Sequence, residues 1–223
     1  MLEDPESTIT RSWTTNADAW TQAVRNGAIE SRERATNAAI VEAVMARRPA
    51  RVLDLGCGEG WLVRDLTDRG VEAVGVDGSL ALIETAIASG GGWFLHGSYE
   101  ELISQSVRFD AAFDVIVANF ALLQEQLTRL LRTLGTLLEP GGRLIIQTVH
   151  PNGVDAPDRE GWRREDFRAF PGCWQAMPWF YRTPEGWRQL LRASGYPTIA
   201  IDETVHPDSR LPLSLILTAP RPA

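Results

Sequence analysis

Hydrophobic residues along this chain fall into short, nearly continuous runs that alternate with segments of helical spacing. The candidate strands are residues 51–55, 72–77, 93–96, 113–119, 143–149, 196–205 and 211–219. The candidate helices after the first strand are residues 61–66, 80–89, 124–138 and 184–194. Near-continuous apolar runs are typical of strands buried on both faces of a parallel sheet. The alternation therefore predicts an α/β domain with helices covering a mostly parallel sheet.

The two ends of this pattern and one interruption divide the chain further. Residues 1–48 carry two helical segments and are expected to form a lid, although plain packing on the domain edge explains the same pattern. Residues 49–150 would be the binding core, and residues 183–223 would add a helix and a closing β-hairpin. Residues 151–182 break the strand–helix rhythm, so they are expected to form a cap insertion.

The cap is rich in aromatic residues, and a connection this long is usually functional. Four of its aromatic side chains are candidates for covering a small apolar substrate: Trp162, Trp174, Trp179 and Tyr181. A dimer interface or packing of tryptophan on the sheet edge would also account for them. An RNA-binding interpretation of the arginines between residues 159 and 168 is disfavoured, because neighbouring acids nearly neutralise them.

Composition narrows the function classes. The 223 residues carry a net charge of −7, which argues against an extended phosphate-binding surface and hence against a nucleic-acid partner. Two cysteines and three isolated histidines show neither a disulfide framework nor metal-ligand spacing, so no metal is expected. No apolar run approaches the roughly 20 residues that span a bilayer, and the acidic N-terminus is unlike a secretory signal. We therefore expect a cytoplasmic protein, monomeric or homodimeric, without a membrane partner.

The candidate chemistry begins where the first strand ends. Asp54 is followed by Gly56, Cys57, Gly58 and Gly60, after which Trp61 and Leu62 start a helix. Glycines let the backbone adopt positive φ and let a ligand approach closely, and the helix start offers free N–H groups. The spacing differs from the G-x-G-x-x-G dinucleotide fingerprint, and a carboxylate at the strand end suits an ammonium better than a pyrophosphate. Cys57 is interpreted as a small filler residue.

This stretch resembles motif I, D/E-x-G-x-G-x-G, of the class I S-adenosylmethionine (SAM) dependent methyltransferases. The phrase from Leu138 to Leu144, Leu-x-Pro-Gly-Gly-x-Leu, and the closing hairpin are similar to features of the ubiquinone-biosynthesis and type 11–12 members. The resemblance implies a three-layer Rossmann-like fold with a seven-stranded, mostly parallel sheet, a C-terminal antiparallel hairpin and a small cap. It also implies SAM as the cofactor and S-adenosylhomocysteine (SAH) as its product.

Asp77 ends the second strand, where a carboxylate can accept two hydrogen bonds from ribose hydroxyls. Capping of the next helix is the competing role, and an NAD site would use the same acid. Gly78 and Ser79 follow it and join the predicted cofactor site.

Other cofactor contacts are carried over from the resemblance. It implies that Trp13 closes the site and that Arg32 binds the SAM carboxylate, with Arg34 as the alternative. It places Ser98 and Tyr99 beside the adenine, although many members have Asp where Ser98 stands. Asn119 and Phe120 would face the methyl group, but the two prolines of the DNA-base amino-methyltransferases are missing there.

His150 follows the strand 143–149, at the sheet edge where ligands of open α/β folds bind. Histidine suits a general base near neutral pH, while a loop histidine bonded to backbone is the alternative. The predicted function is methyl transfer from SAM to an oxygen, nitrogen or carbon nucleophile of a small molecule. The alternatives are a non-catalytic SAM-binding partner or sensor protein and an NAD(P)-binding oxidoreductase.

Overall fold

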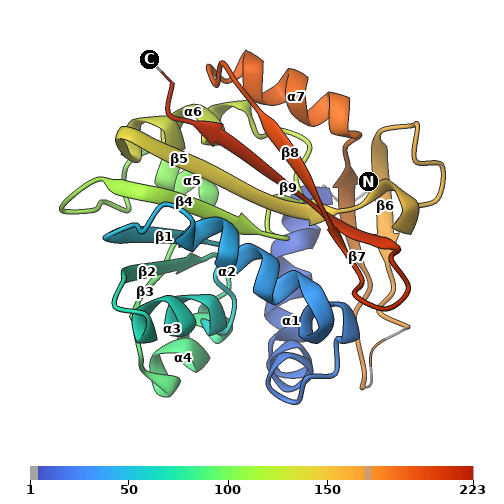
Figure 1. Ribbon diagram of the computed structural model, residues 1–223. Coiled ribbons are helices and arrows are strands. Elements are labelled where there is room, and N and C mark those ends of the chain that lie inside the picture. The colour runs from blue at the N-terminus through green and yellow to red at the C-terminus, as the bar shows by residue number, and fades with distance from the viewer. Residues whose placement is uncertain (1–4, 169, 171, 223) are drawn as a thin grey trace.

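A seven-stranded sheet forms the centre of the computed structural model, which describes residues 5–168, 170 and 172–222 (Figure 1). Its strands are β1 (Arg51–Leu55), β2 (Glu72–Asp77), β3 (Trp93–His96), β4 (Phe113–Asn119), β5 (Leu138–Val149), β8 (Ala200–Val205) and β9 (Pro212–Pro220). They lie in the order β3-β2-β1-β4-β5-β9-β8. The first five are parallel, whereas β9 runs antiparallel to both β5 and β8. The predicted fold class is therefore confirmed.

Both faces of the central strands are buried, which explains why their sequences are almost entirely apolar. Leu53 and Leu55 of β1 belong to one core cluster, and Val52 of the same strand belongs to another. This alternation follows from the two-residue period of side chains in a strand. The cluster of Val52 includes residues of α2 (Asn37–Met45), α3 (Trp61–Asp68) and α4 (Leu80–Ser89). The cluster of Leu53 includes residues of α5 (Tyr99–Ile103), α6 (Thr128–Leu137) and α7 (Pro184–Ala193), which completes three layers.

Three element boundaries differ from those expected from the sequence. The strand predicted over 143–149 begins already at Leu138, because Leu138 pairs with Phe113 of β4 ahead of the irregularity in that ladder. The helix predicted over 124–138 begins only at Thr128, because residues 120–127 form a loop at the end of β4. Arg182 donates to the backbone carbonyls of Gln124 and Glu125, which holds these groups outside a helix. The strand predicted over 196–205 begins at Ala200. Tyr196 instead packs in the core, where its hydroxyl donates to the Leu131 carbonyl over 2.9 Å.

The N-terminal region is helical as expected, with one irregularity. The long helix α1 (Pro5–Arg25) is followed by a π-helical turn, η1 (Arg32–Thr36), which leads into α2. The second of the two helical segments predicted within residues 1–48 is therefore part π-helix and part α-helix. Within the described part of the chain, no helix is both long enough and apolar enough to cross a membrane.

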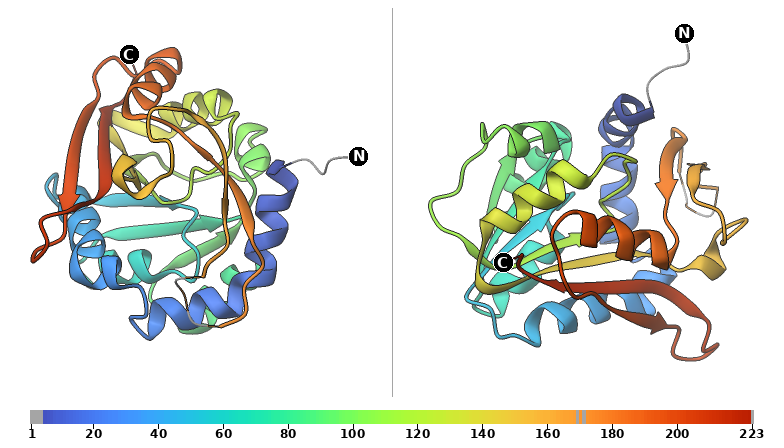
Figure 2. Two further views of the ribbon diagram at one scale, coloured as in Figure 1. Left: turned by 90° about the vertical axis from the view of Figure 1, so that its right-hand side faces the viewer. Right: turned by 90° about the horizontal axis from the view of Figure 1, so that it is seen from above.

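The cap contains a second, two-stranded antiparallel sheet that the sequence pattern did not predict. It comprises β6 (Gly161–Glu165) and β7 (Met177–Tyr181), which follow the short 3-10 helix η2 (Pro151–Gly153). Helix α1 packs against β7, and both lie to the same side of the central sheet (Figures 1 and 2). Lid and cap are thus joined, while the division of the chain at residues 48, 150 and 182 stays a prediction.

Candidate active site

A cavity of about 630 Å³ lies where the parallel strands end at their carboxyl termini. Its floor comes from the segments that follow β1, β2, β4 and β5, and its cover comes from α1 and the cap. The predicted site residues that line it are Trp13, Arg32, Asp54, Gly56, Cys57, Gly58, Trp61, Asp77, Gly78, Ser79, Ser98, Tyr99, Asn119 and Phe120. The fold therefore gathers residues from six separate parts of the sequence around one space.

The glycine turn is held in a single conformation by its surroundings. Gly56 and Gly60 have φ values of 75° and 88°, which L side chains rarely adopt. A Cβ on Gly56 would lie 2.4 Å from the Cβ of Ala121, so the turn can approach the β4 loop only as glycine. Gly60 and Leu62 do not line the cavity; Leu62 is buried in the core cluster below it.

Cys57 fills the space beneath this turn. Its side chain is buried against Gly75, where a Cβ would meet its sulfur at 2.7 Å. Burial, followed by the charges of Asp54 and Asp77, raises the pKa of the thiol well above its usual value. A thiol without thiolate character is a weak nucleophile, which supports the filler interpretation.

Asp54 and Arg32 are two buried ionisable groups, one acidic and one basic, that face this cavity. Asp54 is 2% exposed, and its Oδ1 has no hydrogen-bond partner among the described residues. Burial, reinforced by the charge of Asp77, raises its pKa to about 8, although Arg32 opposes the shift. A buried carboxyl oxygen without a partner is costly, so this atom marks a place where a ligand donor fits.

Arg32 lies at the start of η1, with its guanidinium 5.4 Å from the ring centroid of Trp20 and 4.9 Å from that of Trp61. Its Nε donates to Asn37, and its buried Nη2 has no hydrogen-bond partner within the described residues. Burial lowers the pKa of Arg32 to about 10, which leaves the guanidinium charged near neutral pH. Arg34, the alternative from the sequence, pairs with Asp208 at the surface instead.

Asp77 performs the structural role that the sequence left open beside the ligand role. Its Oδ2 accepts from the Gly58 amide at 2.9 Å, and its Oδ1 accepts from the Ser79 amide at 2.8 Å. Burial raises its pKa, while these two hydrogen bonds oppose the shift. Because a carboxylate oxygen can accept a second hydrogen bond, Asp77 can hold the glycine turn and still receive a hydroxyl from a ligand.

Ser98 and Tyr99 line the cavity while their polar atoms are engaged within the protein. Ser98 forms a capping box with Glu101 at the start of α5. The Tyr99 hydroxyl donates to the Ala121 carbonyl over 3.0 Å. Nearby, the buried Oδ1 of Asn119 has no hydrogen-bond partner among the described residues, so it is free to accept from a ligand.

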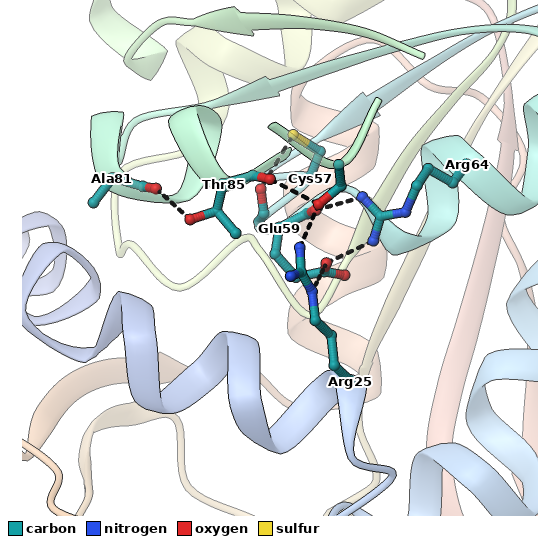
Figure 3. A network of polar contacts seen from close by, with 8 residues as sticks. Arg25, Cys57, Glu59, Arg64, Ala81 and Thr85 are labelled. Atoms are coloured by element: carbon teal, nitrogen blue, oxygen red, sulfur yellow. Dashed lines mark hydrogen bonds and ion pairs between the residues drawn. The ribbon is translucent and has the colours of Figure 1, made fainter. Parts of the chain in front are cut away.

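Sequence reasoning missed a buried carboxylate inside the glycine turn. Glu59 is 1% exposed and ion-pairs with Arg25 of α1 at 3.3 Å and with Arg64 of α3 at 2.6 Å (Figure 3). Figure 3 shows Glu59 between the two guanidinium groups, which come from opposite sides of the turn. The network ties the lid helix to the turn. The sequence offers one signal for Glu59, which is its position between Gly58 and Gly60. An acid in such a turn is ordinarily expected to be solvated, so this signal does not predict burial.

Several predicted residues are not brought to the main cavity. His150 does not line it; its Nε2 lies 3.3 Å from a carboxylate oxygen of Glu203, and its Nδ1 accepts from the Asn152 amide. The predicted base role of His150 therefore gains no support from the geometry and stays a prediction. The alternative, a loop histidine bonded to backbone, describes its observed contacts.

The four predicted cap aromatics mainly build the hairpin. Trp162 packs edge-on against Phe180 at 5.6 Å, and Trp174 stacks on Phe167 at 4.7 Å. Trp179 lines an adjoining cavity of about 120 Å³ rather than the main one, and the Tyr181 hydroxyl donates to the Pro157 carbonyl. The cap residues that do line the main cavity are Glu165, Phe170 and Met177, none of which the sequence singled out.

Within the described residues, no three His, Cys, Asp or Glu side chains come together as a metal site would require. The arrangement is instead a ligand site with one buried acid, one buried guanidinium and a glycine turn, at the carboxyl edge of a parallel sheet. This combination of fold and site defines a methyltransferase domain of the Rossmann-like class.

Comparison with known proteins leads to the same class of protein. The family model described as "Methyltransferase domain" matches residues 29–201, and the chain belongs to that family, as predicted. The chain is 28% identical over 144 residues to a malonyl-[acyl-carrier protein] O-methyltransferase of Pseudescherichia vulneris, covering 64% of this chain and 55% of that protein. It is 30% identical over 119 residues to a ubiquinone biosynthesis O-methyltransferase of Coxiella burnetii, covering 50% and 49%. It thus spans about half the length of these relatives.

Solved structures share the fold over almost their whole length. A SAM-dependent methyltransferase from Mesorhizobium loti superposes with a TM-score of 0.60 at 24% identity, covering 81% of this chain and 98% of that one. The 1,6-didemethyltoxoflavin-N1-methyltransferase of Burkholderia thailandensis, solved with its acceptor and SAH, gives a TM-score of 0.64 at 22% identity, covering 100% and 92%.

Proposed function

We propose that this domain transfers the methyl group of SAM to a small-molecule acceptor. The observation that carries the proposal is the pair of unpaired buried atoms, Asp54 Oδ1 and Arg32 Nη2, on one cavity beside the glycine turn. The amino-acid end of SAM carries an ammonium and a carboxylate, which match these two groups in charge and hydrogen bonding. Asp77 would receive the ribose hydroxyls. The residues present therefore fit the cofactor.

Bound there, the cofactor would supply an electrophilic methyl group on a positively charged sulfur. The protein's part is then to hold the acceptor nucleophile in line with that methyl group and to exclude water from the pair. Asn119 and Phe120 at the end of β4 line the same cavity, and they are the residues that we expect to face the methyl group. A general base is required only for an acceptor that must lose a proton before or during attack.

The acceptor side of the proposal is supported by the composition of the cover. Ile9 and Trp13 of α1, together with Phe170 and Met177 of the cap, present apolar surface to the cavity. A largely apolar chamber with a few polar groups suits a small molecule. The net charge of −7 disfavours nucleic acid as the acceptor, and the cytoplasm remains the predicted compartment.

The test is methyl transfer itself, measured as SAH formation together with a methylated product when the purified protein is given SAM and a panel of aromatic small molecules. We expect turnover with at least one acceptor. We also expect Arg32→Met to weaken SAM binding tenfold or more, because a charge-assisted hydrogen bond contributes about 1.5–3 kcal/mol. Arg34→Met, which removes an equal charge at the surface, is the matched control and should bind as the wild type does.

SAM binding without SAH formation against the whole panel would favour the alternative of a non-catalytic SAM-binding protein. An equal loss of SAM affinity in Arg32→Met and Arg34→Met would show that the net charge of the protein, rather than a contact from Arg32, governs SAM binding.

A further inference from the structure

Besides the glycine turn, the cavity is lined by the polar residues Ser7, Thr10, Glu100, Gln124 and Gln126 and by one carboxylate of the cap. The half beneath α1 and the cap is mainly apolar. Its walls are formed by Ile9 and Trp13 of α1, Leu123 of the β4–α6 loop, and Phe170 and Met177 of the cap. Glu165, the last residue of β6, is the cap's ionisable side chain on this wall. Under the proposed function, this half receives the acceptor.

The position of Glu165 is fixed by the hairpin. It pairs with Met177 across β6 and β7, and its Oε1 accepts from the Phe167 amide at 2.8 Å. Its Oε2 forms no hydrogen bond or ion pair with any residue the structure describes. Glu165 also lines the adjoining 120 Å³ cavity, so it stands at the junction of the two spaces. One carboxylate oxygen is thus anchored and the other is available to a ligand.

Among the described residues, no cationic side chain lines the cavity beside Glu165. The chain contains no lysine, and the arginine that lines the cavity within the described residues is Arg32, which lies at the cofactor end between Trp20 and Trp61. Arg182, which is nearby in the fold, does not line the cavity and donates to the Gln124 and Glu125 carbonyls. A carboxylate on the acceptor would therefore meet a like charge in a partly desolvated space.

A protonated amine on the acceptor would instead carry the charge opposite to that of Glu165. It can donate to the available oxygen of Glu165, and the aromatic residues Trp13 and Phe170, which line the same cavity, are of the kind that attracts cations. We propose that Glu165 selects the acceptor: the domain takes an apolar, mainly aromatic molecule that carries an amine, and it discriminates against acceptors that carry a carboxylate. This inference rests on the proposed function and assigns its substrate class.

The experiment uses two matched series on the protein saturated with SAH. One series is phenethylamine, 2-phenylethanol and phenylacetate, and the other is tryptamine, tryptophol and indole-3-acetate. Binding is measured by calorimetry. We expect the amine of at least one series to bind, and to bind at least tenfold tighter than the carboxylate of the same frame, with the alcohol between them.

Glu165→Gln preserves an oxygen for the Phe167 amide but removes the charge. This variant should weaken amine binding about tenfold. It should also reduce the difference in affinity between the amine and the carboxylate of the same series, while the affinity for SAH stays unchanged. Asp158→Asn removes one charge from an exposed position of the same cap, outside the cavity, and should behave as the wild type.

The inference is overturned if a carboxylate binds as tightly as its amine, if no member of either series binds, or if Glu165→Gln retains the full preference. Absence of SAH binding by the folded wild type is a different result, because it contradicts the proposed function and this inference with it.

Discussion

At the scale of single residues, the site depends on ionisable groups that are buried in the free protein. Asp54 is the clearest case, because burial and the nearby Asp77 raise its pKa to about 8. Below that pH the carboxyl group of the free protein is protonated. A cationic ammonium beside it stabilises the carboxylate, so ligand binding should release a proton from Asp54.

The sign of the resulting pH dependence follows directly. Above about pH 8 the carboxylate is already formed and SAH affinity is at its full value. As the pH falls below 8, affinity should decrease, by at most about tenfold per pH unit, because binding must remove the proton. Calorimetry with SAH at pH 6, 7 and 8, in buffers of different ionisation enthalpy, measures both the affinity and the protons released.

Asp54→Asn should bind SAH more weakly at pH 8 and lose this dependence. A wild-type affinity that is constant from pH 6 to 8, or an equal slope in the variant, would contradict the role assigned to Asp54.

At the scale of elements, the cavity is closed by a direct connection between the lid helix and the cap. The Asn16 side chain of α1 donates to the Gln175 carbonyl and accepts from the Gln175 amide, both at 2.8 Å. Asn16 is 1% exposed, and aromatic residues of α1 and the cap pack around Ile9, Phe167 and Met177 beside it. The two-way hydrogen bond therefore fixes how the cap sits on α1.

Asn16→Leu keeps the side-chain volume but leaves the Gln175 amide unpaired, while the Gln175 carbonyl keeps its hydrogen bond from the Ser12 hydroxyl at 3.2 Å. An unpaired buried backbone group costs about 1–3 kcal/mol. We expect faster amide exchange at Gln175 and a lower melting temperature. Thr14→Ala, on the exposed side of the same helix, is the control and should change neither. An unchanged exchange rate at Gln175 in Asn16→Leu would show that the cap is held independently of this contact.

The sequence predicts some of these elements well for a physical reason. Strands β1 and β2 are buried on both faces, so their apolar runs have clear limits, and the predicted bounds match. The helix α6 begins later than predicted because Leu127 continues the apolar stripe although the chain before it is a loop. The hairpin of β6 and β7 was missed because the charged run on β6 and Pro178 on β7 hide strand alternation.

The same reasoning explains which site residues were predictable. Asp54, Gly56 and Asp77 stand in a local pattern of strand, turn and strand end, which fixes their place in space. Glu59 and Glu165 carry no such pattern, because each looks like a solvated acid in the sequence. Tertiary packing buries Glu59 and places Glu165 on the cavity wall. Residues that depend on contacts between distant segments, such as Asn16 with Gln175, have no local signal.

At the scale of the whole molecule, one cavity is built from two sources. Under the proposed function, the sheet and its glycine turn supply the cofactor end, while α1 and the cap, far apart in sequence, supply the acceptor end. The Arg25–Glu59 ion pair links the two, because it joins the lid helix to the turn. In general, one fold can host different reactions when the residues around its site differ while the core is kept. The monomeric or homodimeric state stays a prediction.

The most direct test of the account is calorimetric titration of the purified protein, freed of co-purified ligand, with SAM, SAH and NAD. We predict micromolar binding of SAM and SAH, clear weakening of both by Asp77→Ala, and no binding of NAD. Folded protein that binds neither sulfur ligand, or that binds NAD instead, would contradict the assignment of this cavity to SAM.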